Sequence, residues 1–456
     1  MEQSPNEFDV FIFNLFQDRD TIMSNHWISR GEELNRELYG KNGYETVSSL
    51  REIFGQMIDL VEEGKGNKRE YCKVLLNYCD LTQDWRYWGV WAEEEISIGA
   101  GSDSPWLFYG FGRYVEEIGQ LRKSLEYHYK GIEVSTVAGD DTFLALNHLG
   151  AGITLQRSLK PQKAEWHIKK ALKIFQKQGD IYQQASALLN LGTLYDRWGK
   201  SNLAISPYQE SDRLLDSIGD IFDRGRVLYS LGMACLEANK LKEAEKAFAQ
   251  GKILSEESNN VLFIALNYYG IGWLEYRKGE IVKARQTLEE AITRFKKATE
   301  EMLGVVQTSF AEAEGHISGL AASAYSKYPE PNYEAALKYL EYAEESYRNL
   351  DYADFSMAKV LANRARILEY SGDIYDAITT FLKLLAEGKR LKSPGMMGDA
   401  AVHLVYIYYQ QRSSIKEWAV LLKKLGICGL WGFAIGCFNR IKSYLGRSKY
   451  LKNTTG

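Results

Sequence analysis

Five glycines recur at intervals of 40 residues and mark the chain as an internal repeat; they are Gly112, Gly152, Gly192, Gly232 and Gly272. Twelve residues after each glycine stands a small side chain, and sixteen residues after it stands a bulky one. The bulky set is His128, Ile168, Tyr208, Phe248 and Leu288. A period of this length is typical of a solenoid, in which each repeat buries its apolar face only against its neighbours. We therefore expect the function to lie on a surface of the array.

The spacing inside one repeat predicts a hairpin of two helices. Residues 185–195 and 204–215 both place apolar side chains three and four positions apart, which is the pattern of an amphipathic helix. The glycine and the small residue belong where the two helices cross closely, and the bulky residue fills the gap beside them. Gly-Asp pairs such as Gly179-Asp180 separate successive repeats. A glycine can end one helix in the left-handed conformation, and an aspartate can cap the start of the next.

These residues carry a family resemblance. The spacing of Gly192, Tyr195, Ala204, Tyr208 and Ser211 resembles the tetratricopeptide repeat (TPR), in a version with longer helices than the common repeat of about 34 residues. The match is strong from about residue 100 to 300. The resemblance implies an all-α fold, a right-handed α-solenoid of tandem helical hairpins. We expect an N-terminal helical extension (1–66), a TPR solenoid of about eight hairpins (67–424), and an apolar, basic C-terminal cap or anchor (425–456).

The start of the array is rich in tryptophan. Residues 72–99 are predicted to form a divergent first hairpin, in which Trp85, Trp88 and Trp91 recur at helical spacing. Such an entry, followed by repeats that end in Gly-Asp, is similar to the repeat arrays linked to signalling ATPases of the STAND class. In the second half, Ala336, Leu340 and Ala343 mark one expected second helix. The set Ala377, Phe381 and Leu384 marks another.

Residues that would support catalysis or metal binding do not cluster in the sequence. The five cysteines are scattered and form neither a disulfide framework nor a closely spaced ligand pair. The stretch Gly199-Lys200-Ser201 has the end of a phosphate-binding loop, but Leu194 stands where that loop needs its first glycine, so we assign it to a turn inside a hairpin. We expect no catalytic site, no metal and no cofactor. The N-terminus shows no secretory signal, so we expect a cytoplasmic protein. Because repeat arrays chiefly supply binding surfaces, we also expect that the protein is not an enzyme.

The charge is unevenly distributed along the chain. From Arg412 onward nine basic residues face one acidic residue, a net charge of +8, so residues 1–411 carry −12 of the overall −4. The tail is interpreted as the only basic region, and within it residues 425–439 form an uncharged, largely apolar run. As a helix this run spans about 22 Å, which is too short for a hydrocarbon core of roughly 30 Å. Two interpretations stay open: a helix that caps the solenoid, and an interfacial anchor with Cys428 or Cys437 available for acylation.

Candidate binding residues follow from the resemblance, since the first helix of each TPR lines the concave face. Five residues after the repeat glycines stand three arginines, with aromatic side chains at neighbouring offsets, a combination that suits a peptide with carboxylates and apolar anchors. Asn190 and Asn363 match an asparagine that holds a ligand's backbone in related arrays. The predicted groove set is Arg113, Arg157, Arg197, Arg226, Arg277, Asn190, Asn363, Tyr229, Tyr269, Trp273 and Tyr276. The alternative is that the arginines only pair with neighbouring acids.

Three functions remain for such an array. The first is a non-catalytic scaffold or adaptor that holds a partner peptide or helix in the groove. The second is a regulatory or sensor subunit that controls a separate ATPase, protease or kinase, and the third is a membrane-proximal assembly factor anchored by the tail. No repeat has the lysine and asparagine pair with which TPR co-chaperones grip heat-shock-protein tails, so that clamp is not expected. Nucleic acid is not expected as a partner of the acidic array either.

Overall fold

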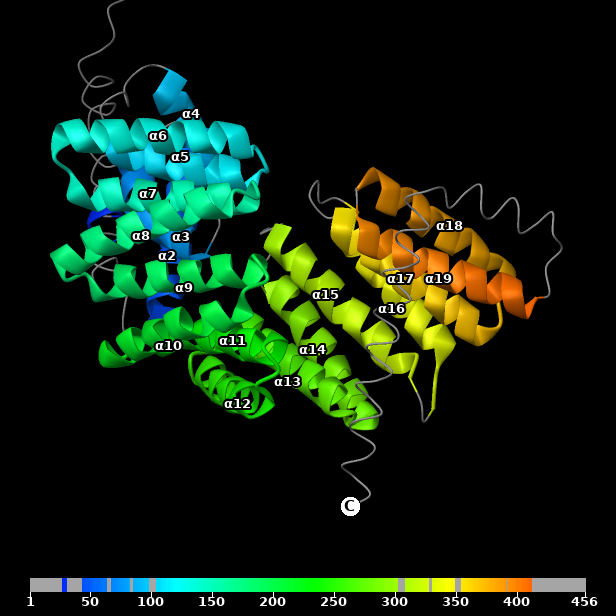
Figure 1. Ribbon diagram of the computed structural model, residues 1–456. Helices are drawn as coiled ribbons and strands as arrows, with labels where there is room; N and C mark the ends of the chain where they lie inside the picture. The colour runs from blue at the N-terminus through cyan, green and yellow to red at the C-terminus, as the bar shows by residue number, and fades with distance from the viewer. Residues whose placement is uncertain are drawn as a thin grey trace, which may run out of the picture. The chain divides into compact units, whose positions relative to one another are not determined.

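The structure is a computed structural model, in which residues 27–30, 43–63, 67–82, 85–97, 104–301, 308–327, 330–348, 354–391 and 393–411 are described. Within these ranges every regular element is an α-helix, which confirms the predicted fold class (Figure 1). The regular stretch of the array consists of α5 (Pro105–Glu117), α6 (Leu121–Ala138), α7 (Asp141–Arg157), α8 (Pro161–Gln178), α9 (Ile181–Arg197), α10 (Ser201–Ser217), α11 (Ile221–Glu237), α12 (Leu241–Glu257) and α13 (Val261–Lys278). None of the described helices has the length and apolar character needed to span a bilayer.

The remaining helices flank this regular stretch on both sides. They are α2 (Gly43–Glu62), α3 (Lys68–Thr82), α4 (Arg86–Ser97), α14 (Ile281–Glu301), α15 (Thr308–Tyr325), α16 (Tyr333–Tyr347), α17 (Asp354–Ser371), α18 (Ile374–Arg390) and α19 (Pro394–Gln410). The predicted second helices at 336–343 and 377–384 correspond to α16 and α18, and their six marker residues are buried. The tail 425–456 lies outside the described residues, so its cap and anchor interpretations stay predictions, as do the proposed domain boundaries.

The chain reverses direction every 20 residues through a left-handed residue. Positive φ angles recur without a gap at Gly119, Gly139, Leu159, Gly179, Gly199, Gly219, Asn239, Asn259 and Gly279. In the turns between hairpins the following aspartate caps the next helix, and the Asp180 carboxylate accepts a hydrogen bond from the backbone N–H of Gln183 at 3.0 Å. Asp140 and Asp220 make the same contact in their repeats. These contacts confirm the predicted junctions and place Gly199 in a hairpin turn.

Close helix crossings account for the repeat glycines. A Cβ atom added to Gly192 would lie 2.5 Å from Cε1 of Tyr208, and one added to Gly152 would lie 2.6 Å from Cγ1 of Ile168. Such distances are below van der Waals contact, so only glycine fits where the bulky side chain of the second helix meets the first. The small partners Ala164 and Ala204 are fully buried at the same crossings. The predicted pairing of glycine and bulky residue is therefore confirmed.

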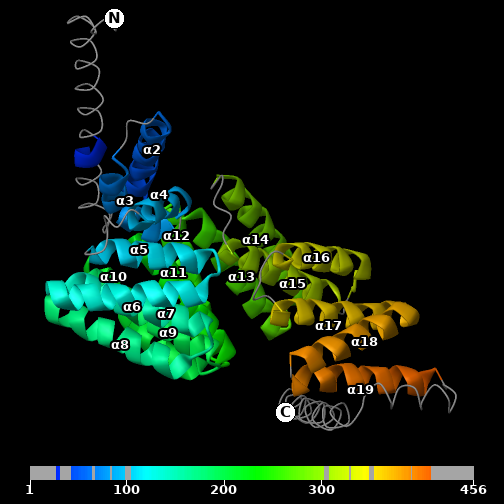
Figure 2. The same cartoon turned by 90° about the horizontal axis from the view of Figure 1, so that it is seen from above.

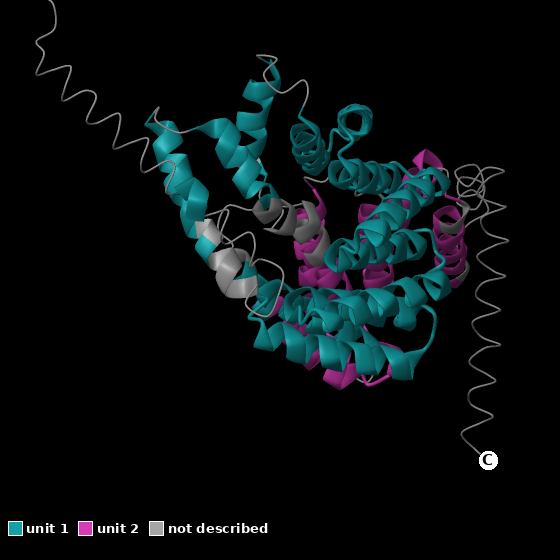
Figure 3. Ribbon diagram, turned by 90° about the vertical axis from the view of Figure 1, so that its left-hand side faces the viewer, with its two compact units in different colours: residues 1–274, 294–307 teal, residues 275–293, 308–456 magenta. Residues whose placement is uncertain are grey.

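The described chain falls into two compact units, each built from hairpins (Figure 3). Unit 1 comprises residues 1–274 and 294–307, and unit 2 comprises residues 275–293 and 308–456. In unit 1, α5 pairs with α6, α7 with α8, α9 with α10, and α11 with α12 (Figure 2). The first helices of successive hairpins also contact one another, α5 with α7, α7 with α9, and α9 with α11. First helices therefore lie on the inner side of unit 1, as the TPR resemblance implies.

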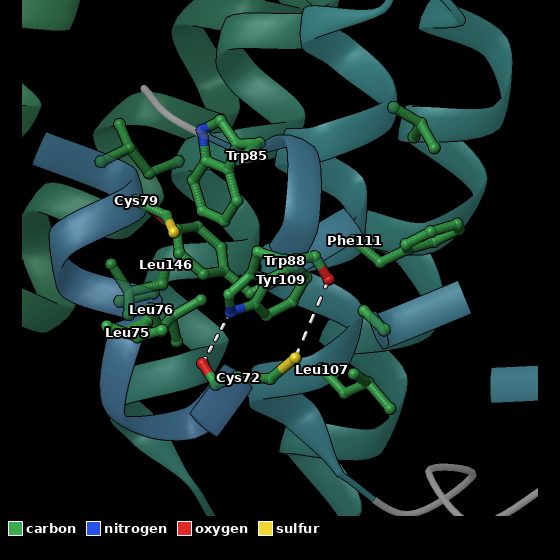
Figure 4. Packing of buried hydrophobic residues seen from close by; sticks show 14 of the residues in the cluster. Cys72, Leu75, Leu76, Cys79, Trp85, Trp88, Leu107, Tyr109, Phe111 and Leu146 are labelled. Carbon is green, nitrogen blue, oxygen red and sulfur yellow. Dashed lines mark hydrogen bonds between the residues drawn. The ribbon is translucent and has the colours of Figure 1, made fainter. Parts of the chain in front are cut away.

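An aromatic core closes the N-terminal end of unit 1. Trp85, Trp88 and Trp91 are all buried, and Trp88 donates a hydrogen bond from Nε1 to the carbonyl oxygen of Cys72 at 2.6 Å (Figure 4). The rings of Trp85 and Trp88 meet edge to face with centroids 5.4 Å apart, a favourable arrangement for aromatic pairs. Burial raises the pKa of the Cys72 thiol above its ordinary range. The predicted divergent first hairpin is thus present as α3 and α4, with Trp85 just before α4.

Candidate functional site

Two neighbouring inner helices present matched stripes of accessible side chains. On α9 the stripe is Tyr182, Ser186, Asn190, Thr193 and Arg197, and on α11 it is Phe222, Arg226, Ser230, Met233 and Glu237. Each α11 residue stands 40 positions after its α9 counterpart, and the spacing of three and four puts each stripe on one helix face. All ten side chains are half-buried or exposed. We call these ten residues the α9–α11 surface.

A polar network joins the two stripes. The Tyr182 hydroxyl on α9 donates a hydrogen bond to Oδ2 of Asp223 on α11 at 2.8 Å. Nη2 of Arg226 lies 2.9 Å from the other carboxylate oxygen of Asp223, so the charge of Arg226 is balanced within the fold. The network therefore fixes the register of α9 and α11 while leaving the Arg226 side chain partly accessible.

A second buried carboxylate lies beside this network. Asp220 caps α11 by accepting a hydrogen bond from the backbone N–H of Asp223 at 3.0 Å. Burial, reinforced by the neighbouring Asp223 carboxylate, raises the pKa of Asp220 to about 7. The charge next to the α9–α11 surface consequently changes near neutral pH.

The space between these helices is small. Tyr182, Ser186 and Leu189 on α9, with Arg226 and Val227 on α11, line a recess that is too small to admit a water molecule. Ligand pockets for small molecules are usually about 300–1,000 Å³. A ligand of this region would therefore lie across the α9–α11 surface and would not fill an enclosed pocket.

The two N-terminal members of the predicted arginine set belong to an ion cluster. Arg113 is 6% exposed and pairs with the fully buried Glu116 one turn along α5. From α7, Arg157 Nε lies 3.3 Å from Glu116 Oε1 and its Nη2 lies 3.2 Å from Glu117 Oε1. Two guanidinium groups thus face two carboxylates, and the cluster ties α5 to α7. For Arg113, Arg157 and Arg226 the alternative of pairing with neighbouring acids describes the structure; a role in partner binding stays a prediction.

The other predicted residues are distributed over four helices. Asn190 on α9 donates from Nδ2 to the carbonyl oxygen of Ser186 at 2.9 Å, and Asn363 on α17 in unit 2 donates to Ser323 Oγ at 3.4 Å. Arg197 is exposed at the end of α9, and Tyr229 is half-buried on α11, its ring against Phe248 and Phe263. The remaining four are on α13, where Tyr269 is buried against Trp273, Trp273 and Tyr276 are half-buried, and Arg277 is exposed.

The structure therefore brings Arg197, Asn190, Arg226 and Tyr229 to adjacent inner helices. Sequence reasoning missed Tyr182 and Ser186 of the α9–α11 surface, and the buried Asp223 that is hydrogen-bonded to Tyr182 and ion-paired with Arg226. Their signal was present in the repeat: Ser186 stands six residues before Gly192, the same offset as Arg226 in the next repeat, and Tyr182 and Asp223 stand ten and nine residues before their repeat glycines, about one turn further upstream. Asp223 could not be found by charge alone, because its partners come from two helices.

The described residues include one close pair of histidines. Nδ1 of His148 on α7 lies 3.0 Å from Nδ1 of His167 on α8, and burial lowers the pKa of each ring to about 4. Both rings are therefore neutral at pH 7, and one donates its proton to the other. Nowhere in the described ranges do three or more His, Cys, Asp or Glu side chains gather as metal ligands would.

Comparisons with known proteins give the fold. No protein-family model and no curated protein sequence matches the chain. Among solved structures, the apo form of the quorum sensor NprR from B. thuringiensis is similar, with a TM-score of 0.52 and 12% identity over 80% of this chain and 97% of that one. The STAND protein PH0952 from Pyrococcus horikoshii, which has a TPR sensor, matches with a TM-score of 0.50 and 14% identity over 79% of this chain. This chain spans 53% of that protein's length.

Three observations agree on the fold. The sequence repeats every 40 residues, each repeat forms a hairpin whose glycine meets the bulky residue of its second helix, and the similar solved structures include arrays of the same kind. The chain therefore has the fold of a tetratricopeptide-repeat solenoid.

Proposed function

We propose that the protein is a non-catalytic interaction scaffold that holds a peptide or helix of a partner protein across the α9–α11 surface. The observation that carries this proposal is the pair of matched stripes, which keep accessible side chains at the same five positions of two adjacent inner helices. Repeat arrays chiefly provide extended binding surfaces of this kind.

The chemistry of the two stripes suits a mixed peptide. Arg197 offers an exposed guanidinium that can bind a carboxylate through two parallel hydrogen bonds. Phe222 and Met233 supply apolar contacts on α11, and the hydroxyls and amide of Ser186, Thr193 and Asn190 supply polar ones on α9. Apolar anchors surrounded by polar groups are the usual composition of a protein interface.

The matched stripes also make the surface easy to block. Ser186 is small and half-buried, the second of the five residues along the α9 stripe, so Ser186→Trp would occupy the surface without removing a charge or a large apolar side chain. Gln250→Trp places the same ring at an exposed position of α12, a second helix, and serves as the matched control.

The test uses peptides selected from a displayed library on the wild-type protein. Fluorescence anisotropy should show that these peptides bind Ser186→Trp at least tenfold more weakly and bind Gln250→Trp within twofold of wild type. Circular dichroism should show that both variants keep the helical signal. Selected peptides that bind the two variants equally well would place the ligand elsewhere and contradict the proposal.

A second candidate is a regulatory or sensor subunit for a separate effector enzyme. It is supported by the nature of the two similar solved structures, one described as a quorum sensor and the other as a STAND protein with a TPR sensor. A sensor must change its equilibrium between conformations when the ligand binds. Small-angle scattering with and without a selected peptide should then show a change in radius of gyration. An unchanged scattering curve at saturating peptide would favour the plain scaffold.

A further inference from the structure

Helix α8 carries a single sign of charge along one exposed face. Lys163, Trp166, Lys170, Lys173 and Lys177 follow one another at intervals of three and four residues, and all five are exposed. With Lys169 and Glu165 counted, α8 has five lysines and one acidic residue. The expectation that the C-terminal tail is the only basic region is therefore wrong. We call the five aligned residues the lysine stripe.

The other second helices of unit 1 do not repeat this pattern. At the same five repeat positions α6 alternates in sign, with Lys123, Glu126, Lys130 and Glu133 ahead of Val137. At these five positions α10 has two charged residues, Glu210 and Arg213, which form an ion pair with each other. The corresponding residues of α12 are Glu243, Lys246, Gln250, Ile253 and Glu257. The exposed faces of α6, α10 and α12 therefore carry both positive and negative side chains, whereas the lysine stripe of α8 carries positive ones only.

The fold itself gives no reason for the lysine stripe. Helix α8 packs through its opposite face, where Ala164, Ile168, Ala171 and Phe175 are fully buried. Like charges three and four residues apart destabilise a helix by a few tenths of a kcal/mol per pair. In the part of the chain that the structure describes, Lys177 alone in the stripe has an acidic neighbour, with Nζ 3.5 Å from Asp141 Oδ2 and both side chains well exposed. The remaining lysines repel one another without compensation.

Exposed rings lie at the N-terminal half of the stripe. Trp166 is 58% exposed and meets the His148 and His167 rings edge to face. On the other side of His167, Tyr129 of α6 is 43% exposed, with its ring centroid 5.7 Å from that of His167. The buried histidines thus support two accessible aromatic side chains. An exposed tryptophan among unpaired cations is the composition of a binding anchor, since tryptophan and charged partners dominate interface energies.

We propose that the lysine stripe binds an acidic amphipathic helix of a partner protein, with Trp166 receiving an apolar side chain from that helix. Lys163, Lys170 and Lys177 are seven residues apart. At a rise of about 1.5 Å per residue, successive lysines of this set lie about 10 Å apart along the axis of α8. Carboxylates placed seven residues apart on a second helix have the same spacing along their own helix axis. Two helices lying side by side, about 8–10 Å apart, can therefore match charge to charge along the whole stripe.

The width of the basic surface selects among anionic partners. A membrane or a nucleic-acid duplex would extend over the neighbouring helix α6, where Glu126 and Glu133 are exposed. Those carboxylates repel a broad anionic surface, so the region that attracts an anionic partner is limited to α8. A slender acidic helix, which contacts α8 alone, fits this distribution.

The test measures binding of a labelled synthetic helix to the full chain by fluorescence anisotropy. The probe is a three-heptad peptide with glutamates at the spacing of the stripe and one leucine placed to meet Trp166. A scrambled peptide of the same composition is the control ligand. The variant Lys170→Glu with Lys173→Glu reverses the stripe, and Lys242→Glu with Lys246→Glu makes the same charge change on exposed lysines of α12. Trp166→Ala removes the anchor.

The proposal predicts that wild type prefers the patterned over the scrambled peptide by at least tenfold, and that added salt weakens the binding. Reversal of the stripe should lower the affinity by at least tenfold, Trp166→Ala should lower it severalfold, and the α12 variant should stay within twofold. Circular dichroism reports that each variant remains helical. Equal affinity for the two peptides, or equal effects of the α8 and α12 variants, would overturn the proposal. Tighter binding of single-stranded oligothymidylate or of phosphatidylserine vesicles than of the peptide would overturn it as well.

Discussion

Asn147 and Asn267 stand 120 residues apart and make the same contacts in their hairpins. Each donates from Nδ2 to the carbonyl oxygen of the phenylalanine four residues earlier, at 2.8 Å in both cases. Each also reaches the first helix of the preceding repeat, at Pro105 O (3.3 Å) and Gly225 O (3.5 Å). They differ in two respects. His128 Nδ1 lies 3.4 Å from Oδ1 of Asn147, whereas Phe248 stands at the corresponding repeat position near Asn267. Asn267 in addition donates from Nδ2 to Ser255 Oγ at 3.3 Å.

This difference predicts unequal effects of one substitution. Asn147→Ala removes two donated hydrogen bonds and the partner of buried His128, and should destabilise the array by about 1–3 kcal/mol. Asn267→Ala also removes a contact at 3.3 Å with Ser255 Oγ, but Oδ1 of Asn267 is buried without a hydrogen-bond partner in the described structure, and losing that atom relieves a penalty, so this change should cost less. Thermal unfolding monitored by circular dichroism gives both midpoints. A larger fall for Asn267→Ala would contradict this account of the two sites.

Leu159 occupies a left-handed turn in which other repeats place glycine or asparagine. Its φ is 56° and its side chain is 87% exposed, so it gains no burial in return for the strained backbone. Leu159→Gly should raise stability by about 1 kcal/mol. The matched reverse change, Gly199→Leu, alters the same turn one repeat later, where φ is 71°, and should lower stability. If the two changes shift the unfolding midpoint in the same direction, turn strain is not the cause.

Buried histidines should make the array sensitive to acid. The folded pKa values of His148 and His167 are lowered to about 4, below the ordinary value of 6.5, so the unfolded chain binds protons that the folded chain refuses. Their contribution to stability is complete above pH 6.5 and is lost as the pH falls from 6.5 towards 4. Replacing both by glutamine should reduce the fall in unfolding midpoint between pH 7 and pH 4.5. An unchanged fall would show that other groups control it.

Asp220 acts in the opposite direction over part of the same range. Its folded pKa of about 7 exceeds the ordinary 3.8, so the folded chain binds the additional proton and this carboxylate favours folding increasingly as the pH falls from 7 to 3.8. Asp220→Asn keeps a side-chain oxygen to cap α11 but removes this titration. The variant should therefore lose stability more steeply than wild type on acidification. A shallower loss in a series of melts at stepped pH would contradict the assignment.

Two arginines of the predicted column should respond differently to removal. Arg157→Ala leaves buried Glu116 with one cation fewer, so it should lower stability by about 1–3 kcal/mol. Arg197 is exposed on the α9–α11 surface, so Arg197→Ala should leave the melting curve nearly unchanged and weaken a selected peptide, with a flatter salt dependence. Melting curves and anisotropy measured on both variants test the distinction. Peptide binding lost through Arg157 alone would reverse it.

The packing positions could be predicted from the sequence because a glycine and a bulky side chain sixteen residues later recur in each repeat. The contact of Tyr208 with Gly192 is one such pair. It did not reveal the 20-residue period of the turns, since Leu159, Asn239 and Asn259 replace glycine there and only the backbone angles expose the regularity. Arg197 and Asn190 were found by their offset from a repeat glycine. The ion cluster of Arg157 with Glu116 was not predicted, because it depends on how α7 is set against α5, which spacing within one helix does not specify.

The central claim is that a partner peptide lies across the α9–α11 surface, and hydrogen–deuterium exchange tests it most directly. With a selected peptide at saturation, the account predicts slower exchange in α9 (Ile181–Arg197) and α11 (Ile221–Glu237), and little change in α10 (Ser201–Ser217), which lies between them in the sequence. Protection confined to second helices, or to segments outside 181–237, would contradict the claim.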